Sequence, residues 1–310
     1  MIIDAHLDTI LQLQKYPSLR KIYDSHCDYQ RLCKYLDVAF FAVFIHPRKY
    51  AACPLPELMR YFGTFKQDLS RNRDLVELLL YKEQLKSSKS KILLGVEGGD
   101  FIGDDQELLT LMQALGLRFL GLTWNHDNQL AAACGSQQGL TSWGKQVIKQ
   151  CNDLDIIVDL AHASERSFWN ALAVSNQPIM VSHAACNACH SHRRNLNDHQ
   201  LKELGRAGGV VGITFVKDFL ASHDPDLDDI VRHIVHAVEV AGIDAVGIGS
   251  DFDGAEVAAL KGVEDLPFLW LRLREAGFSQ EELDKIAGDN FLRFLQGLLP
   301  NKEKGHTSRF

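Results

Sequence analysis

Eight short, largely apolar runs rich in β-branched residues recur along the chain, and each precedes a polar stretch with helical spacing. Runs without strict polar alternation are typical of parallel strands that are buried on both faces. Strands that alternate with helices predict an α/β fold. The predicted strands are Ile2–Ala5, Val38–Ile45, Ile92–Val96, Phe119–Thr123, Ile156–Leu160, Ile179–Ser182, Val210–Phe215 and Ala245–Gly249.

The stretch Asp226–Ala241 has the clearest helical pattern. Acidic residues open it, which complements the positive end of a helix dipole, and its apolar residues fall on one face before Gly242 ends the pattern. The stretches Asn197–Gly205 and Ser279–Leu298 read the same way. Pro54–Ser87 is long enough for more than one helix and predicts an insertion after the second strand.

Side chains that can bind metal ions lie at or just past these apolar runs. They are His6, Asp8, Glu97, His126, His162, His183 and Asp251. In a closed barrel such positions meet at the C-terminal mouth, where active sites of that fold are built. In a doubly wound open sheet, the alternative, the first and eighth strands could lie far apart. We therefore predict a single (β/α)8 TIM-type barrel over residues 1–298, followed by a polar C-terminal tail at 299–310.

Composition excludes several classes of protein. The chain has 310 residues, a size that suits one α/β barrel with insertions. Its formal charge of −7 is spread along the sequence, whereas nucleic-acid binders need clustered basic residues. The longest wholly apolar run, Val38–Ile45, is too short to span a bilayer. The seven cysteines are an odd number, which argues against a disulfide framework. A cleaved leader peptide would remove His6 and Asp8. For both reasons we expect a cytoplasmic protein.

Imidazoles and carboxylates without a thiolate predict a pair of metal ions, best satisfied by two Zn²⁺ per chain. His6 and Asp8 can hold one ion, because residues i and i+2 of an extended backbone point the same way. His162 and His183 can hold the other, and the Glu97 carboxylate can bridge both. Two ions about 3.5–4 Å apart would lower the pKa of a shared water towards roughly 7.

Asp251 follows the last predicted strand in Gly249-Ser250-Asp251-Phe252-Asp253-Gly254 and can move a proton from the attacking water to the leaving nitrogen. Taken singly, each residue has a simpler explanation, since Asp8 and Asp251 could cap a helix or a turn. Glu97 is harder to explain in this way, because a carboxylate that ends a buried strand needs a partner. As a set, these residues predict a metal-dependent hydrolase.

The chain resembles the renal (membrane) dipeptidase family of zinc peptidases, within the wider amidohydrolase group, over nearly its whole length. The resemblance rests on the order and spacing of seven motifs. They are Asp4-Ala5-His6-Leu7-Asp8, Gly95-Val96-Glu97-Gly98-Gly99, Asp159-Leu160-Ala161-His162-Ala163-Ser164, Val181-Ser182-His183, Arg193-Arg194-Asn195, Gly249-Ser250-Asp251-Phe252-Asp253-Gly254 and Asp289-Asn290-Phe291.

The resemblance implies a metallo-dipeptidase of the membrane dipeptidase type that tolerates a D-residue at the C-terminal position. It implies the same five metal ligands, with Glu97 and Asp251 in catalysis, and Arg194 as the clamp on the substrate's C-terminal carboxylate. Trp124 stands where mammalian members carry a histidine that contacts the substrate carbonyl. His126, two residues further on, is the alternative for that contact. Val216 replaces an aromatic substrate contact.

Two alternative functions stay open: an amidohydrolase for another small amide, such as an N-acyl amino acid or a lactam, and a catalytically inactive metal-binding barrel. Family analogy suggests a homodimer, and we expect no membrane or nucleic-acid partner.

The segment Cys186-Asn187-Ala188-Cys189-His190 matches the pattern of covalent haem attachment. Structural use of Cys186 and Cys189 is the preferred interpretation, with a redox-sensitive pair as the alternative. His233 and His236, on the predicted helix Asp226–Ala241, are expected to be solvated.

Overall fold

Eight parallel strands close into a barrel in the computed structural model, which describes residues 1–46, 54–105 and 107–302. The first strand pairs with the last, and β2 pairs with β4 along their full lengths, so the sheet has no open edge between them. The barrel prediction is confirmed and the open sheet is excluded. The barrel strands are β1 Ile3–Leu7, β2 Val38–Phe44, β4 Ser90–Glu97, β5 Leu117–Gly121, β6 Ile157–Asp159, β7 Met180–Ala184, β8 Val210–Ile213 and β9 Val246–Ile248.

One additional strand, β3 (Val76–Leu78), pairs only with the start of β4. It joins the side of β4 that β5 takes over further along the strand. β3 belongs to the segment predicted as an insertion, together with helix α3 (Pro54–Arg71). β3 could not be predicted from the sequence, because three residues are too few to show a period.

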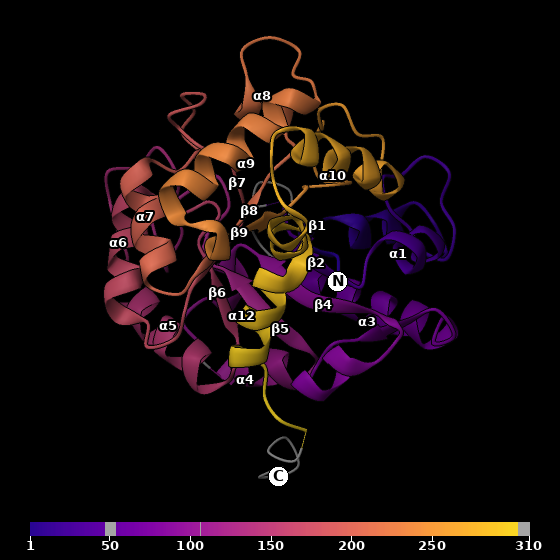
Figure 1. The fold of residues 1–310 in the computed structure, drawn as a ribbon. Helices are drawn as coiled ribbons and strands as arrows, with labels where there is room; N and C mark the ends of the chain where they lie inside the picture. The colour runs from indigo at the N-terminus through magenta and orange to yellow at the C-terminus, as the bar shows by residue number, and fades with distance from the viewer. Residues whose placement is uncertain (47–53, 106, 303–310) are drawn as a thin grey trace.

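Helices surround the barrel as a ring (Figure 1). They are α1 Tyr29–Tyr35, α3 Pro54–Arg71, α4 Glu107–Ala114, α5 Ser142–Asp153, α6 Glu165–Val174, α7 Asp198–Arg206, α8 Lys217–Leu220, α9 Leu227–Ala241, α10 Leu266–Glu275, α11 Gln280–Asp284 and α12 Asn290–Leu298. Short 3₁₀ helices lie at Thr9–Gln14, Lys82–Lys86, Gly99–Ile102, Ile243–Ala245 and Val263–Asp265, and a π-turn, Lys285–Asp289, joins α11 to α12.

The starts of the predicted helices follow from their caps. The Asp226 carboxylate accepts the backbone N–H groups of Asp228 and Asp229 at the start of α9, and Asn197 caps α7 in the same manner. The predicted helix Ser279–Leu298 is α11, a π-turn and α12 in succession.

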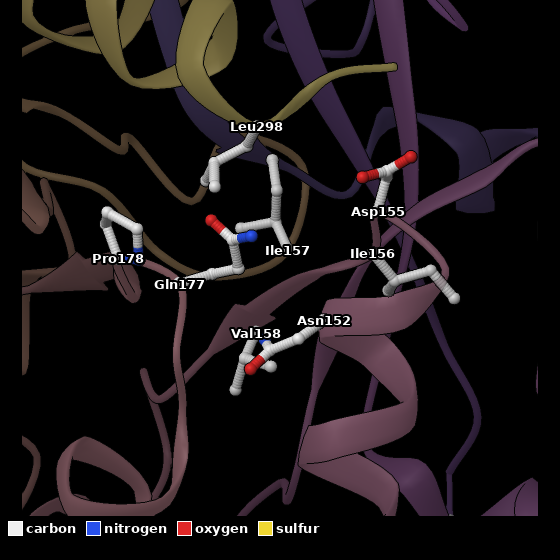
Figure 2. Close-up of a pocket in the computed structure, with 8 residues that line it drawn as sticks. All are labelled: Asn152, Asp155, Ile156, Ile157, Val158, Gln177, Pro178 and Leu298. Carbon is white, nitrogen blue, oxygen red and sulfur yellow. The ribbon is translucent and has the colours of Figure 1, made fainter. Parts of the chain in front are cut away.

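Helix α12 closes the amino-terminal end of the barrel and lies across the strands in Figure 1. Its Phe291 and Phe294 pack with Phe40 and Phe119 from the barrel strands in one buried cluster. A small pocket beside helix α12 is lined by residues that include Ile157, Gln177 and Leu298 (Figure 2). Its cavity of about 10 Å³ has room for about one water molecule. A substrate site therefore has to be sought at the opposite end.

Of the expected C-terminal tail, residues 303–310 lie outside the described residues. Leu299 is buried, and the carbonyl of Pro300 accepts a hydrogen bond from the Lys82 backbone. Within the described ranges, no helix combines the length and the apolar character needed to cross a bilayer.

Candidate metal centre

All five predicted metal ligands meet, buried, at the C-terminal mouth of the barrel. His6 lies in β1, Glu97 ends β4 and His183 lies in β7. Asp8 and His162 follow the ends of β1 and β6. His6 and His183, more than 170 positions apart, lie with ring centroids 3.8 Å apart and the rings tilted by 42°. Closure of the barrel is what brings them together.

Glu97, His162 and His183 form a compact group of three donor atoms. Glu97 Oε1 lies 2.7 Å from His162 Nε2 and 3.5 Å from His183 Nε2, and the two nitrogens are 3.1 Å apart. Ligands at 2.0–2.1 Å from a tetrahedral zinc ion are separated from one another by about 3.3–3.4 Å. The triangle therefore has the size of one face of a tetrahedral site.

His6, Asp8 and Glu97 form the second group. His6 Nε2 lies 3.6 Å from Asp8 Oδ2 and 3.8 Å from Glu97 Oε1. His6 Nε2 and Asp8 Oδ1 are buried and have no hydrogen-bond partner in the described part of the chain. Such atoms are costly unless something else satisfies them, and lone pairs turned toward one another suit a cation. Glu97 Oε1 belongs to both groups.

The route by which Asp8 reaches the site differs from the expected one. Asp8 is not extended, with φ −93° and ψ 14°, because β1 ends at Leu7 and a short 3₁₀ helix starts at Thr9. Its carboxylate therefore meets His6 across a turn and not along one face of a strand.

Asp251 lies beside Asp8, at the end of β9. Its backbone is left-handed, with φ 63°, and its N–H donates to the His6 carbonyl at 3.0 Å. A Cβ atom at Gly254 would overlap both the Asp8 and the Asp251 carboxylates, so glycine at this position lets the two groups approach. Positive φ at a residue other than glycine is uncommon, and it often occurs at functional sites.

Burial shifts the pKa values of these groups in different directions. Burial raises the pKa of Asp251 to about 8, a shift that His6 opposes and that the Asp8 and Glu97 carboxylates reinforce. For Glu97, burial alone would raise the pKa, but the neighbouring His162 and then His6 lower it to about 2. Two nearby carboxyl groups are thus suited to different tasks, one to stay charged and one to exchange a proton. Burial lowers the pKa of His162 to about 4 and also lowers that of His183, which favours neutral, ligand-competent rings.

Arg194 is buried beside the donor groups, whereas Arg193 is exposed. The Arg194 guanidinium donates to the backbone carbonyls of Ala161 and His183, and its Cζ lies 5.2 Å from the centre of the Phe219 ring. Its Nε is buried and has no hydrogen-bond partner among the residues described. At least this N–H donor of the planar guanidinium is therefore available beside the candidate metal ligands.

Trp124 and His126 occupy different surroundings. The Trp124 ring lies 6.3 Å from the His162 ring and 4.6 Å from Phe44, so it forms part of the wall of the site. His126 Nε2 lies 2.8 Å from Asp100 Oδ1, and its Nδ1 has no partner in the described ranges. His126 is thus held by Asp100 and leaves one ring nitrogen for another contact.

Three residues without a role predicted from the sequence lie behind the imidazoles: Ser182 and Asn125 contact a ring directly, and Asp159 contacts Ser182. Ser182 Oγ lies 2.9 Å from His183 Nδ1 and donates to Asp159 Oδ2 at 2.5 Å. Asn125 Oδ1 lies 2.9 Å from His162 Nδ1. A polar residue inside an apolar strand, such as Ser182, was the available signal, because a buried polar group needs a partner.

Cys186 has a structural setting. It is buried, its backbone N–H donates to His233 Nδ1 at 3.0 Å, and its thiol donates to the His233 carbonyl at 3.3 Å. The groups of potential metal ligands found in the described residues lie at the barrel mouth and include neither Cys186 nor Cys189. His233 is fully buried, so the expectation that it is solvated was wrong. It lies on the buried face of α9 beside Ile230 and Ile234, and its ring bonds to the Cys186 backbone N–H and the Leu220 carbonyl.

The environment of His233 predicts a pH-dependent stability. Burial lowers its pKa from 6.5 to about 4, against the hydrogen bond to Leu220. Below pH 6.5 the unfolded chain takes up a proton that the native ring refuses, so the free energy of unfolding should fall as the pH drops toward 4, by about 3 kcal/mol. Urea denaturation between pH 7 and 4 measures this effect. The free energy of unfolding should fall less with pH in His233→Gln than in the unaltered protein. His236→Gln, on the same helix but paired with Asp198 at the surface, is the control and should keep the steep loss. Equal slopes for all three proteins would contradict the prediction.

A sequence model of the membrane dipeptidase family (peptidase family M19) matches residues 1–308. An uncharacterized dipeptidase of Schizosaccharomyces pombe is 36% identical over 220 residues, which cover 67% of this chain and 53% of that protein. Dipeptidase tcpJ of Claviceps purpurea is 32% identical over 220 residues, covering 68% of this chain and 52% of that protein. The matched part of the chain thus spans about half the length of these curated relatives.

Solved structures share the whole architecture. The metallopeptidase dipeptidase AC, of the same family, has a TM-score of 0.90 at 26% identity and covers 96% of this chain and 98% of its own. A metallopeptidase from Rhodobacter sphaeroides, liganded with a phosphinate mimic of the dipeptide L-Ala-D-Ala, has a TM-score of 0.89 at 25% identity and covers 96% of this chain and 99% of its own.

Proposed function

The chain belongs to the membrane dipeptidase family, and we propose that it hydrolyses dipeptides with the help of two zinc ions at the barrel mouth. The observation that carries this proposal is the position of Glu97 Oε1, within 4 Å of His6 Nε2, His162 Nε2 and His183 Nε2 at once. A carboxylate shared by two sets of donors is suited to bridge a pair of ions. His6 and Asp8 would hold the first ion, His162 and His183 the second, and Glu97 both.

Bound divalent ions would supply Lewis acidity at the substrate carbonyl and an acidified water at neutral pH. Asp251 would take a proton from the attacking water on a carboxylate oxygen and pass it to the leaving nitrogen. The C–N bond breaks, water is consumed, and two amino acids result. A raised pKa suits Asp251 to this exchange, because the group must be able both to accept and to release a proton near neutral pH.

Substrate recognition would fall to residues around the donor groups. Arg194 would bind the C-terminal carboxylate of a dipeptide, and its Nε–H, which has no partner among the described residues, supports this role. Trp124 would line the site beside His162, and His126 could contact the carbonyl through Nδ1. The phosphinate mimic of L-Ala-D-Ala on the Rhodobacter sphaeroides enzyme supports tolerance of a D-residue at the C-terminal position.

Three further expectations remain proposals. Residues 1–298 would form one catalytic domain, and two such chains would pair as a homodimer. Location in the cytoplasm is proposed from the cysteines, because Cys27, Cys134, Cys151 and Cys186 are free and buried.

Metal analysis and a substrate panel test the proposal together. The purified protein should contain about two ions per chain, and chelation should abolish hydrolysis of L-Ala-D-Ala until Zn²⁺ is restored. Amidation of the substrate's C-terminus should lower kcat/KM by about 10- to 100-fold, since the Arg194 contact is lost. A protein that is fully active without metal would refute the proposal. Faster turnover of N-acyl amino acids or lactams than of any dipeptide would favour the amidohydrolase alternative, and metal binding without hydrolysis the inactive barrel.

A further inference from the structure

One buried hydroxyl group contacts an imidazole from each of the two proposed metal subsites. Ser182 Oγ lies 3.2 Å from His6 Nδ1 and 2.9 Å from His183 Nδ1. Both contacts are on the nitrogen that faces away from Glu97, since the Nε2 atoms of both rings face Glu97 Oε1. Ser182 is fully buried, so no bulk solvent competes for these bonds.

Counting donors and acceptors fixes the direction of each bond. A serine hydroxyl has one proton and two lone pairs. Asp159 Oδ1 already accepts the backbone N–H groups of Ser182 and Ala161, at 2.9 and 3.0 Å, and Asp159 Oδ2 lies 2.5 Å from Ser182 Oγ. The hydroxyl proton therefore goes to Asp159, and the two lone pairs of Ser182 are left to accept one N–H from each imidazole.

We propose that Asp159 and Ser182 act as a positioning pair that keeps a proton on Nδ1 of both His6 and His183. Each ring then has only Nε2 with which to bind an ion, and a single hydroxyl sets the orientation of one ligand in each subsite. This inference rests on the proposed function for its consequence, the binding of two ions, but not for its hydrogen-bond pattern. Groups behind a metal ligand commonly fix its ring and tautomer in this way.

Asn125 provides the contrast within the same site. Its Oδ1 lies 2.9 Å from His162 Nδ1, so it directs the remaining imidazole, and no bond joins it to His6 or His183 in the described residues. Loss of Asn125 should therefore disturb one subsite, whereas loss of Ser182 should disturb both.

Another arrangement of the same atoms makes a different prediction. His6, Asp159 and His183 also lie close enough to one another to suggest a metal group of their own. An ion there would need bare Nδ1 atoms on both rings. The Ser182 hydroxyl stands between these nitrogens and Asp159, at hydrogen-bond distance from all three residues, which favours protons on Nδ1.

Nitrogen-15 spectra of the imidazoles test the hydrogen-bond pattern directly. Both Nδ1 atoms should carry a proton in the metal-free and in the zinc-loaded protein, with signals assigned by His6→Gln and His183→Gln. A bare Nδ1 on either ring would overturn the inference, whether it arose from a third metal group or from a protonated Asp159 that donates to Ser182. Metal content in the same samples tests the proposed function separately, so the two can fail independently.

Zinc titrations against a competing chelator test the consequence. Ser182→Ala should weaken the binding of both ions by about 10- to 100-fold, and Asn125→Ala should weaken only one. Ser167→Ala is the matched control, because Ser167 is equally buried but bonds to the Ala132 carbonyl and touches no imidazole. The affinities of Ser167→Ala for the two zinc ions should match those of the unaltered protein.

Asp159→Asn keeps the shape of the side chain and guards against a trivial loss of folding. Its amide would turn a donor toward Ser182, whose hydroxyl would then face three N–H groups with two lone pairs. Binding of both ions should weaken as in Ser182→Ala, while thermal unfolding of the metal-free variants stays cooperative. Ser182→Ala with two unchanged affinities, or with one weakened step only, would refute the positioning role.

Discussion

Asp251→Asn is expected to lower kcat for L-Ala-D-Ala hydrolysis by about 10²- to 10⁴-fold, the usual contribution of a positioned general acid–base group. The amide has nearly the shape of the carboxyl group but cannot take a proton from water or return one to the leaving nitrogen. The metal ligands lie on other residues, so the variant should keep both ions. The change should fall mainly on kcat, because proton transfer stabilises the transition state and not the bound substrate.

Steady-state kinetics together with metal analysis of the same sample measure this effect. Asp253→Asn is the matched control, two residues further along the same segment. The Asp253 carboxylate is bound by Thr9 Oγ1 at 2.5 Å and by the His26 backbone N–H at 2.7 Å, so it has a structural setting. Activity of Asp253→Asn should stay within a few-fold of the unaltered protein. Asp251→Asn with near-normal kcat would show that Asp251 does not move the proton. Loss of the ions would contradict the assignment of the metal sites to other residues.

The barrel could be predicted because its evidence is repeated along the chain. Each strand is short, but eight apolar runs in alternation with helical stretches leave few topologies, and strand bounds such as Val38–Phe44 agree with the sequence to within one residue. Helix starts could also be predicted, since a cap such as Asp226 is a local signal. The strand β3 could not be predicted, because its three residues form a strand through pairing with β4 and have no pattern of their own.

The convergence of the proposed metal ligands could be predicted for a related reason. Parallel strands of a barrel end at one mouth, so the chemistry at the ends of separate strands converges whatever the details of packing. What the sequence could not supply was the direction of each side chain. Asp8 reaches the site from a turn, and His233 turns inward from a helix position that looked solvated, because a backbone N–H and a carbonyl need partners there.

The residues behind the ligands were hidden for another reason. Ser182 and Asp159 belong to two of the family motifs, but their contacts join three different strands, β1, β6 and β7. A pattern in one segment reports which side chain is polar, whereas its partner is fixed by the register between strands. Such contacts between strands can be identified only in the folded barrel.

Glu97→Gln is expected to have the second large effect, the loss of both ions. Glu97 Oε1 is the only atom that both donor groups share, and the amide offers a weaker, uncharged ligand in its place. Removal of groups that merely support a ligand costs about 10- to 100-fold in metal affinity, so loss of the shared carboxylate should exceed 100-fold. Hydrolysis should fall at least as far at limiting zinc, since the ions supply the Lewis acid.

Metal content after gel filtration, followed by zinc titration, measures this effect, with Glu57→Gln as the control. Glu57 is a buried glutamate of helix α3, its carboxylate pairs with Arg60 at 3.0 Å, and it belongs to none of the groups of potential metal ligands found in the described residues. That variant should retain about two ions per chain. Selective loss of one ion in Glu97→Gln would mean that one subsite is complete without the carboxylate. Retention of both ions would mean that nothing bridges them, because His6 with Asp8 and His162 with His183 would then each suffice alone.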